Sequence, residues 1–185
     1  PHNALAVVVK SDPVTDKDYL RGDKNSRIIL VEYSDLECPF CKMFHPTAKQ
    51  VVDTYPGKVA WVFRHFPLTQ IHQNAPLAAK ATEAAGLQGK FWEMHDIIYD
   101  KQSEWSETLS ARDLFLVYAT TLGLDTKKFS QDLNNKSIEE KILAEYKEGV
   151  NLGIMGTPTF FINGKMIESP ASAEAFDKLI KEAAK

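Results

Sequence analysis

The sequence Ile28-Ile29-Leu30-Val31-Glu32-Tyr33 is followed closely by Cys38-Pro39-Phe40-Cys41, which contains both cysteines of the chain. The first stretch is short, β-branched and flanked by polar residues, as is typical of a central strand covered on both faces. The second predicts the start of a helix, because a proline is tolerated in a first turn that needs no backbone donor. Two thiols separated by two residues at a strand-to-helix junction can open and close a disulfide. Thiol–disulfide exchange is therefore the leading interpretation.

The composition is ordinary for a globular protein, with 44% hydrophobic and 25% charged residues. A length of 185 residues fits one domain, or one domain that carries a large insertion. The net charge of −3 and the scattered lysines provide no basic footprint for nucleic acid and no polybasic membrane patch. Because the chain begins at Pro1 rather than Met, we expect that a signal peptide or a membrane anchor was removed upstream.

Alternating β and α patterns continue along the chain. Residues 1–27 form a lead-in that is turn-rich after the apolar run at residues 4–9, with turns expected at Ser11-Asp12-Pro13 and at Arg21-Gly22-Asp23 and with at most one strand. The helix that starts at the cysteines should run to about Tyr55 with a kink at Pro46, and a strand is predicted over 59–63. Further helices are predicted over residues 75–85, 91–99, 111–121, 138–152 and 171–184, with breaks that include 101–107. Near the end, Asn163-Gly164 is a strong hairpin signal between strands at 159–162 and 165–167.

Cys38 is predicted to lie at a helix N-terminus, where free amide donors and a partial positive charge favour a thiolate. In such settings the pKa of a cysteine falls to roughly 3.5–7.5. Cys38 is therefore the expected attacking or attacked sulfur and the more exposed of the pair. Cys41, one turn inward, is the expected resolving partner. The negative charge of Glu37, directly before Cys38, should modestly oppose the thiolate.

Three other interpretations of the cysteine pair stay open. A structural disulfide would close so small a loop that its chain-entropy contribution is only about 2 kcal/mol. A zinc site made of Cys38, Cys41 and His45 has plausible spacing, although a structural site normally takes four ligands and the chain has no second cysteine pair. The third possibility is a pair of inert buried thiols.

Glu32 and Pro158 are unusual for the strands in which they are predicted to lie. A glutamate is almost never fully buried without a partner, so Glu32 is either at a solvent-facing edge or kept near Cys41 for chemistry. We favour the second, in which its carboxylate accepts and returns the proton of Cys41 during exchange. Pro158 would weaken a central strand because it lacks a donor. A cis peptide after Thr157 would present the Thr157 main chain to the cysteines, and an ordinary trans bond is the alternative.

These residues resemble the DsbA-like disulfide oxidoreductases of the thioredoxin superfamily. The spacing from Glu32 to Cys38 matches that of the family, and Pro46, five residues past Cys41, matches the proline in the family's helix. The sequence GTPTFFING at 156–164 is similar to the cis-proline loop and the hairpin that follows it. The resemblance extends over nearly the whole chain from about Ile28.

The resemblance implies an α/β protein, namely a thioredoxin fold with an inserted α-helical domain. Residues 28–69 and 153–185 would form the thioredoxin-fold domain, residues 70–152 the inserted helical domain, and residues 1–27 an N-terminal lead-in. Catalysis would use a redox-active Cys38–Cys41 disulfide with the help of Glu32, without a cofactor or a metal.

Further expectations also follow from this resemblance. The substrate would be a folding protein with free thiols, held by Pro39, Phe40, Thr157 and Pro158. We expect a monomer in the periplasm or cell envelope that binds no nucleic acid and is reoxidised by a quinone-linked membrane partner. A membrane anchor in the full-length protein is one alternative for its attachment to the envelope. A reductase or isomerase on the same fold is the alternative, followed by a metal-binding thiol module. Strongly oxidising members carry histidine where this chain has Phe40, so the helix terminus must stabilise the thiolate here.

Overall fold

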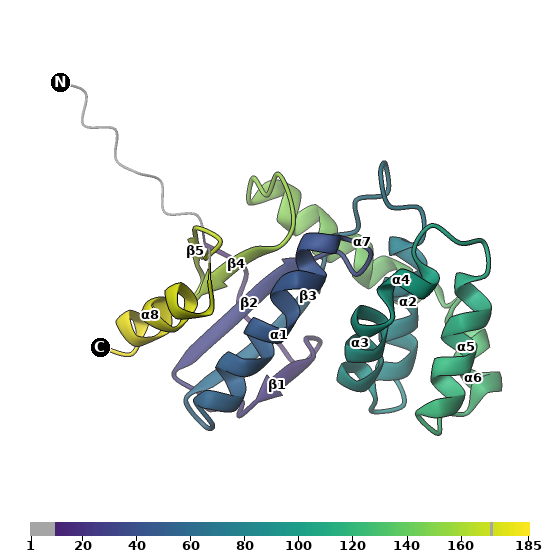
Figure 1. Cartoon of the computed structure of the whole chain (residues 1–185), viewed down its shortest axis with the longest axis horizontal. Helices are drawn as coiled ribbons and strands as arrows, with labels where there is room; N and C mark the ends of the chain where they lie inside the picture. The colour runs from purple at the N-terminus through teal and green to yellow at the C-terminus, as the bar shows by residue number, and fades with distance from the viewer. Residues whose placement is uncertain (1–9, 171) are drawn as a thin grey trace.

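A computed structural model describes residues 10–170 and 172–185 and shows a five-stranded sheet with the order β1-β3-β2-β4-β5 (Figure 1). The apolar run at residues 4–9 of the lead-in lies outside the described residues. The strands are β1 (Leu20–Gly22), β2 (Ile28–Ser34), β3 (Val59–His65), β4 (Thr159–Ile162) and β5 (Lys165–Ile167). β2 and β3 pair in parallel, whereas the other three pairs are antiparallel. The strand that leads to the cysteines is therefore central.

The helices fall into two groups. α1 (Pro39–Thr54) and α8 (Ala173–Ala183) belong to the part of the chain that forms the sheet. Six more, which we call the helical insertion, lie between β3 and β4: α2 (Ala75–Gly86), α3 (Phe91–Asp100), α4 (Gln102–Trp105), α5 (Ala111–Thr121), α6 (Thr126–Asp132) and α7 (Lys136–Asn151). Within the described residues, no helix is both long enough and apolar enough to cross a bilayer.

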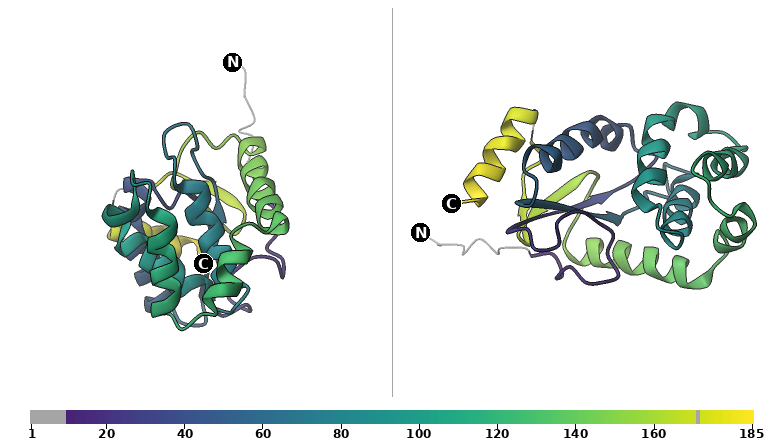
Figure 2. Two further views of the ribbon diagram at one scale, coloured as in Figure 1. Left: turned by 90° about the vertical axis from the view of Figure 1, so that its right-hand side faces the viewer. Right: turned by 90° about the horizontal axis from the view of Figure 1, so that it is seen from below.

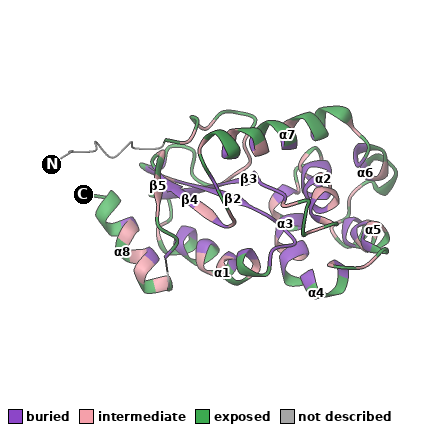
Figure 3. Ribbon diagram, turned by 90° about the horizontal axis from the view of Figure 1, so that it is seen from above, coloured by how far each residue is buried: buried purple, intermediate pink, exposed green. Residues whose placement is uncertain are grey.

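Helices cover both faces of the sheet, with α1 and α8 on one face and α7 on the other (Figure 2). Alternate residues of β2 point to opposite faces, so Leu30 packs in the core beneath α1, while Val31 and Tyr33 join the smaller core beneath α7. In Figure 3 the central strands β2 and β3 and the inner faces of the helices are largely buried, and the outer faces of the helices are exposed. Full burial of a large apolar side chain stabilises the fold by about 1.5–3 kcal/mol.

The helical insertion extends the larger core past one end of the sheet (Figure 1). Buried alanines of α2, such as Ala78 and Ala81, let α3 pack closely against that helix. Large aromatic side chains, among them Phe115 and Phe129, fill the space between the outer helices. The predicted fold class, a thioredoxin fold with inserted helices, is confirmed.

Several local predictions were wrong. The turn expected at Arg21-Gly22-Asp23 contains β1, which is stabilised by antiparallel pairing with β3 rather than by a sequence pattern. The break expected at 101–107 contains α4, anchored by Trp105, whose indole donates to the Ile98 carbonyl at 2.8 Å. The unpredicted α6 is too short to show a periodic pattern. Helix α1 continues through Pro46, and the kink there stays a prediction.

Candidate active site

The two cysteines lie where β2 passes into α1. Cys38 has an extended backbone, with φ −70° and ψ 124°, and is the residue that precedes the helix, while Pro39 occupies its first turn. This arrangement leaves the first amides of α1 available to the Cys38 sulfur. Cys38 is 4% exposed and Cys41, one turn further, is 0% exposed. Both are present as free thiols.

The surroundings of Cys38 favour its thiolate. A hydrogen bond from the Cys41 thiol, supported by the Cys41 and Phe40 backbone amides and by the Thr157 side chain, lowers the pKa of Cys38 to about 6. Burial acts in the opposite direction but is outweighed. At neutral pH the Cys38 sulfur is therefore largely the thiolate, which is the reactive form in thiol–disulfide exchange.

Cys41 is held in the opposite protonation state. Burial, followed by the neighbouring Cys38 sulfur, raises the pKa of Cys41 well above its ordinary value, although the Ser34 and Thr157 side chains act against this. One sulfur is thus charged and accepts a hydrogen bond, and the other is neutral and donates it. This asymmetry fits an attacking and a resolving sulfur.

The cis-proline loop lies against the cysteines. The peptide bond between Thr157 and Pro158 is cis, and the Cys38 sulfur lies 3.7 Å from the Thr157 carbonyl oxygen. Pro158 is buried, whereas Pro39 and Phe40 are exposed, the latter at 63%. The structure therefore places Thr157 against the Cys38 sulfur, while Pro39 and Phe40 follow Cys38 at the exposed start of α1.

Glu32 lies in the middle of the sheet, not at an edge, because β2 has β3 on one side and β4 on the other. Its side chain is 1% exposed, and burial raises the pKa of Glu32 to about 7, with the Ser34 and Trp61 side chains opposing the rise. Like Leu30, two residues earlier, it points to the α1 face. Its Oε2 atom lacks a hydrogen-bond partner among the described residues. A buried carboxyl with this pKa can exchange a proton near neutral pH.

The sequence analysis missed Asp35 and Gln102, two polar residues near the cysteines, and it missed the hydrogen bonds of a third, Glu37. Asp35 and Glu37 are both buried, at 1% and 5% exposure, and accept hydrogen bonds from backbone amides. Gln102 of α4 donates to the backbone of the cysteine loop. Glu37 was expected only to oppose the thiolate by its charge. Its partners are backbone amides of distant residues, so no sequence motif could have indicated this role.

His45 does not join the cysteines. Its Nε2 atom lies 3.6 Å from an oxygen of Asp96, and its ring stacks on Tyr99. Two groups of described residues are close enough together to share an ion, one of His45, His95 and Asp96 and one of His65, Glu83 and Glu145. The cysteines belong to neither group, so the geometry does not favour a zinc site with His45.

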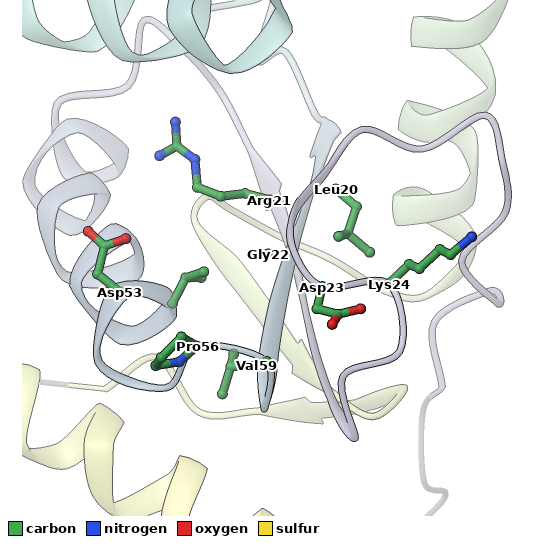
Figure 4. A pocket seen from close by; sticks show the side chains of 10 residues that line it. Leu20, Arg21, Gly22, Asp23, Lys24, Asp53, Pro56 and Val59 are labelled. Atoms are coloured by element: carbon green, nitrogen blue, oxygen red, sulfur yellow. The ribbon is translucent and has the colours of Figure 1, made fainter.

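A surface hollow lies at the far end of α1 from the cysteines (Figure 4). Arg21 and Asp23 from β1 and the following turn, Asp53 from the end of α1, and Val59 from β3 are among its lining residues. It contains none of the predicted site residues. The chemistry predicted for the cysteines does not involve this hollow.

Comparison with known proteins agrees with the fold. A family model described as Thioredoxin matches residues 14–182. The chain therefore belongs to the thioredoxin family, and its likeness is to members of the DsbA type. The crystal structure of alpha-DsbA1 from Wolbachia pipientis is 27% identical, with a TM-score of 0.81 and coverage of 92% of both chains. Oxidised BdbD from Bacillus subtilis shares the fold, with a TM-score of 0.82, 20% identity, and coverage of 95% of this chain and 97% of that one.

The chain also matches part of a group of larger proteins. A Na⁺/H⁺ antiporter NhaA 3 from Salinispora tropica is 37% identical over 179 residues, which is 97% of this chain but 26% of that protein. A Na⁺/H⁺ antiporter NhaA from Herminiimonas arsenicoxydans is 29% identical over 96% of this chain and 27% of its own length. The chain thus spans about a quarter of the curated relatives that it matches.

Proposed function

We propose that the chain is a thiol:disulfide oxidoreductase that introduces disulfide bonds into exported proteins through the Cys38–Cys41 pair. The observation that carries this proposal is the opposed protonation of the two sulfurs, with a Cys38 pKa of about 6 above a buried, neutral Cys41. An inert pair or a purely structural bridge would not need this arrangement. The likeness to alpha-DsbA1 supports the same reaction class.

The first step is attack by a substrate thiolate on the Cys38 sulfur of the oxidised enzyme. A bond forms between the substrate sulfur and Cys38, the Cys38–Cys41 bond breaks, and Cys41 leaves as a thiolate. A thiolate is unfavourable at this buried position, so Cys41 must take up a proton. The Glu32 carboxyl, whose pKa of about 7 keeps much of it protonated at neutral pH, is the proposed donor.

The second step oxidises the substrate. A second substrate thiolate attacks the substrate sulfur in the mixed disulfide, a substrate disulfide forms, and Cys38 leaves as a thiolate. The low pKa of Cys38 makes it a good leaving group. The substrate has lost two electrons and the enzyme has gained them as a dithiol. Thr157, Pro158, Pro39 and Phe40 are the proposed contacts for the substrate chain.

The cycle closes when an external oxidant restores the disulfide. A quinone-linked membrane protein outside the cytoplasm is the proposed oxidant, by analogy with DsbA-type proteins. In this proposal the enzyme acts as a monomer on protein thiols in the cell envelope, without a cofactor.

The reduction potential of the Cys38–Cys41 pair, measured by equilibration in graded glutathione buffers, tests the direction of the reaction. A value near about −120 mV, as in strongly oxidising members, together with disulfide formation in a reduced protein substrate, is the expected result. A value near about −270 mV, as in thioredoxin, would identify a reductase and contradict the proposed direction. The Cys38→Ser variant is the control and should show no exchange.

A further inference from the structure

The loop that leads to Cys38 is tied to the helical insertion by the carboxylate of Glu37. One of its oxygens accepts from the backbone amide of Asn74 at 2.7 Å, directly before α2. The other accepts from the backbone amide of Glu107 at 3.1 Å, in the segment between α4 and α5. A single buried side chain thus joins the residue beside the reactive sulfur to two separate parts of the insertion.

Gln102 makes a second tie from α4. Its side-chain amide donates to the carbonyl of Leu36 at 2.8 Å and to the carbonyl of Cys38 at 3.1 Å. Gln102 is only 6% exposed, so water does not readily replace these hydrogen bonds. The carbonyl of Cys38 also accepts from the amide of Lys42, which is the first hydrogen bond of α1.

These ties act on the groups that hold the thiolate. The Cys38 sulfur is stabilised by the backbone amides of Phe40 and Cys41, whose direction depends on where α1 begins. The start of α1 depends in turn on the backbone of residues 36–38. Gln102 holds the carbonyls at both ends of this segment, and the Glu37 side chain holds its middle residue. Hydrogen bonds stabilise a charged acceptor most strongly when the surrounding structure already holds their donors in the right direction.

We propose that Glu37 and Gln102 are positioning residues through which the helical insertion fixes the start of α1, so that the Phe40 and Cys41 amides face the Cys38 sulfur. Neither residue takes part in bond making or proton transfer. This inference rests on the proposed function for its catalytic meaning, because it concerns the reactivity of Cys38. It can nevertheless be tested on the acidity of Cys38 without any substrate.

The sign of the effect separates positioning from simple electrostatics. If Glu37 acted only through its charge, removal of that charge would relieve repulsion and lower the pKa of Cys38. If Glu37 is a positioning residue, Glu37→Gln replaces one acceptor oxygen by an NH₂ donor that faces a backbone amide. One of the two hydrogen bonds to the insertion is then lost. The pKa of Cys38 should then rise, by about half a unit to one unit.

The decisive experiment follows the Cys38 thiolate by its ultraviolet absorbance during a pH titration of the reduced protein. Glu148→Gln is a matched control, because it removes the same charge from a carboxylate that accepts from Arg64 and from the amide of Asp12, away from the cysteine loop. We expect an upward shift for Glu37→Gln and no shift for Glu148→Gln. An unchanged or lowered pKa of Cys38 in Glu37→Gln would overturn the proposal.

Gln102→Met provides an independent arm without a change of charge. Its control is Gln88→Met, since Gln88 also bridges to backbone groups, those of Asp125, but remote from the cysteines. The pKa of Cys38 should rise in Gln102→Met alone, and equal titrations in both variants would contradict the proposal. If Glu37→Gln does not fold, the comparison of Gln102→Met with Gln88→Met alone tests the proposal. Failure of the wild-type protein to oxidise a substrate would instead count against the proposed function and leave these titrations interpretable.

Discussion

The sheet half of the molecule and the helical insertion contribute to the site in different ways. β2, α1 and the cis-proline loop supply the sulfurs, the buried carboxyl of Glu32 and the Thr157 main chain. The insertion supplies no reacting atom in this account, but its backbone amides and Gln102 hold the loop before Cys38. All reacting groups of this account therefore lie in the sheet half, whereas the insertion supplies only groups that hold the loop, and substitutions in the two parts should have different signatures.

The largest expected effects come from the cysteines. Cys38→Ser should reduce thiol–disulfide exchange to the uncatalysed rate, because the reactive sulfur is lost. Cys41→Ser should instead accumulate mixed disulfides on Cys38, since the resolving sulfur is missing, and mass spectrometry of the trapped adducts measures this. If Cys38→Ser instead accumulates mixed disulfides on Cys41, as many as Cys41→Ser accumulates on Cys38, the roles assigned to the attacking and resolving sulfurs would be wrong.

The next effect belongs to the insertion and should leave the sulfur chemistry untouched. Lys141 lies between the buried carboxylates of Glu83 and Glu145, and its Nζ atom is 2.8 Å from an oxygen of Glu145. Lys141→Met would leave both carboxylates without this cation, at a cost of about 3–5 kcal/mol in the free energy of unfolding. Urea denaturation measures the loss. A large shift in the pKa of Cys38 in the folded variant would contradict the claim that this part of the insertion does not influence the sulfur chemistry.

Glu32 should make stability depend on pH. Its pKa is raised from 4.5 to about 7 in the folded protein, so the folded state binds a proton more tightly than the unfolded state. The resulting stability is complete below about pH 4.5 and is lost as the pH rises through about 7. A shift of this size corresponds to a stability change on the order of 3 kcal/mol. Urea unfolding of the oxidised protein at several pH values measures it, with Glu32→Gln as the control. An equal slope in that variant would assign the pH dependence to other groups.

The smallest expected effect is at an exposed ion pair of the insertion. The Nζ atom of Lys101 lies 2.8 Å from an oxygen of Glu104, but both side chains are nearly half exposed. Glu104→Gln should therefore leave the free energy of unfolding almost unchanged, because solvent screens an exposed ion pair. This neighbour of Gln102 tests whether any change in α4 disturbs the site. A Cys38 titration that moves as far as in Gln102→Met would show that the effect is not specific to the Gln102 hydrogen bonds.

The same division explains what the sequence could predict. The central strand, the helix that starts at the cysteines and the hairpin at Asn163-Gly164 have strong local patterns, and the structure contains all three. β1 is held by pairing with a strand far along the chain, and α4 by burial of Trp105, so neither has a local pattern. The hydrogen bonds of Glu37 to backbone amides depend on tertiary structure alone, because every residue except proline has such an amide.

The central claim is that the neutral Cys41 thiol, together with the first backbone amides of α1, makes Cys38 an acidic and reactive sulfur. Its most direct test is the pH titration of the thiolate absorbance of the reduced wild-type protein, with Cys38→Ser to assign the signal. The account predicts a single transition near about pH 6 that disappears in Cys38→Ser. A transition near about 8.5, the value of an ordinary cysteine, would contradict it.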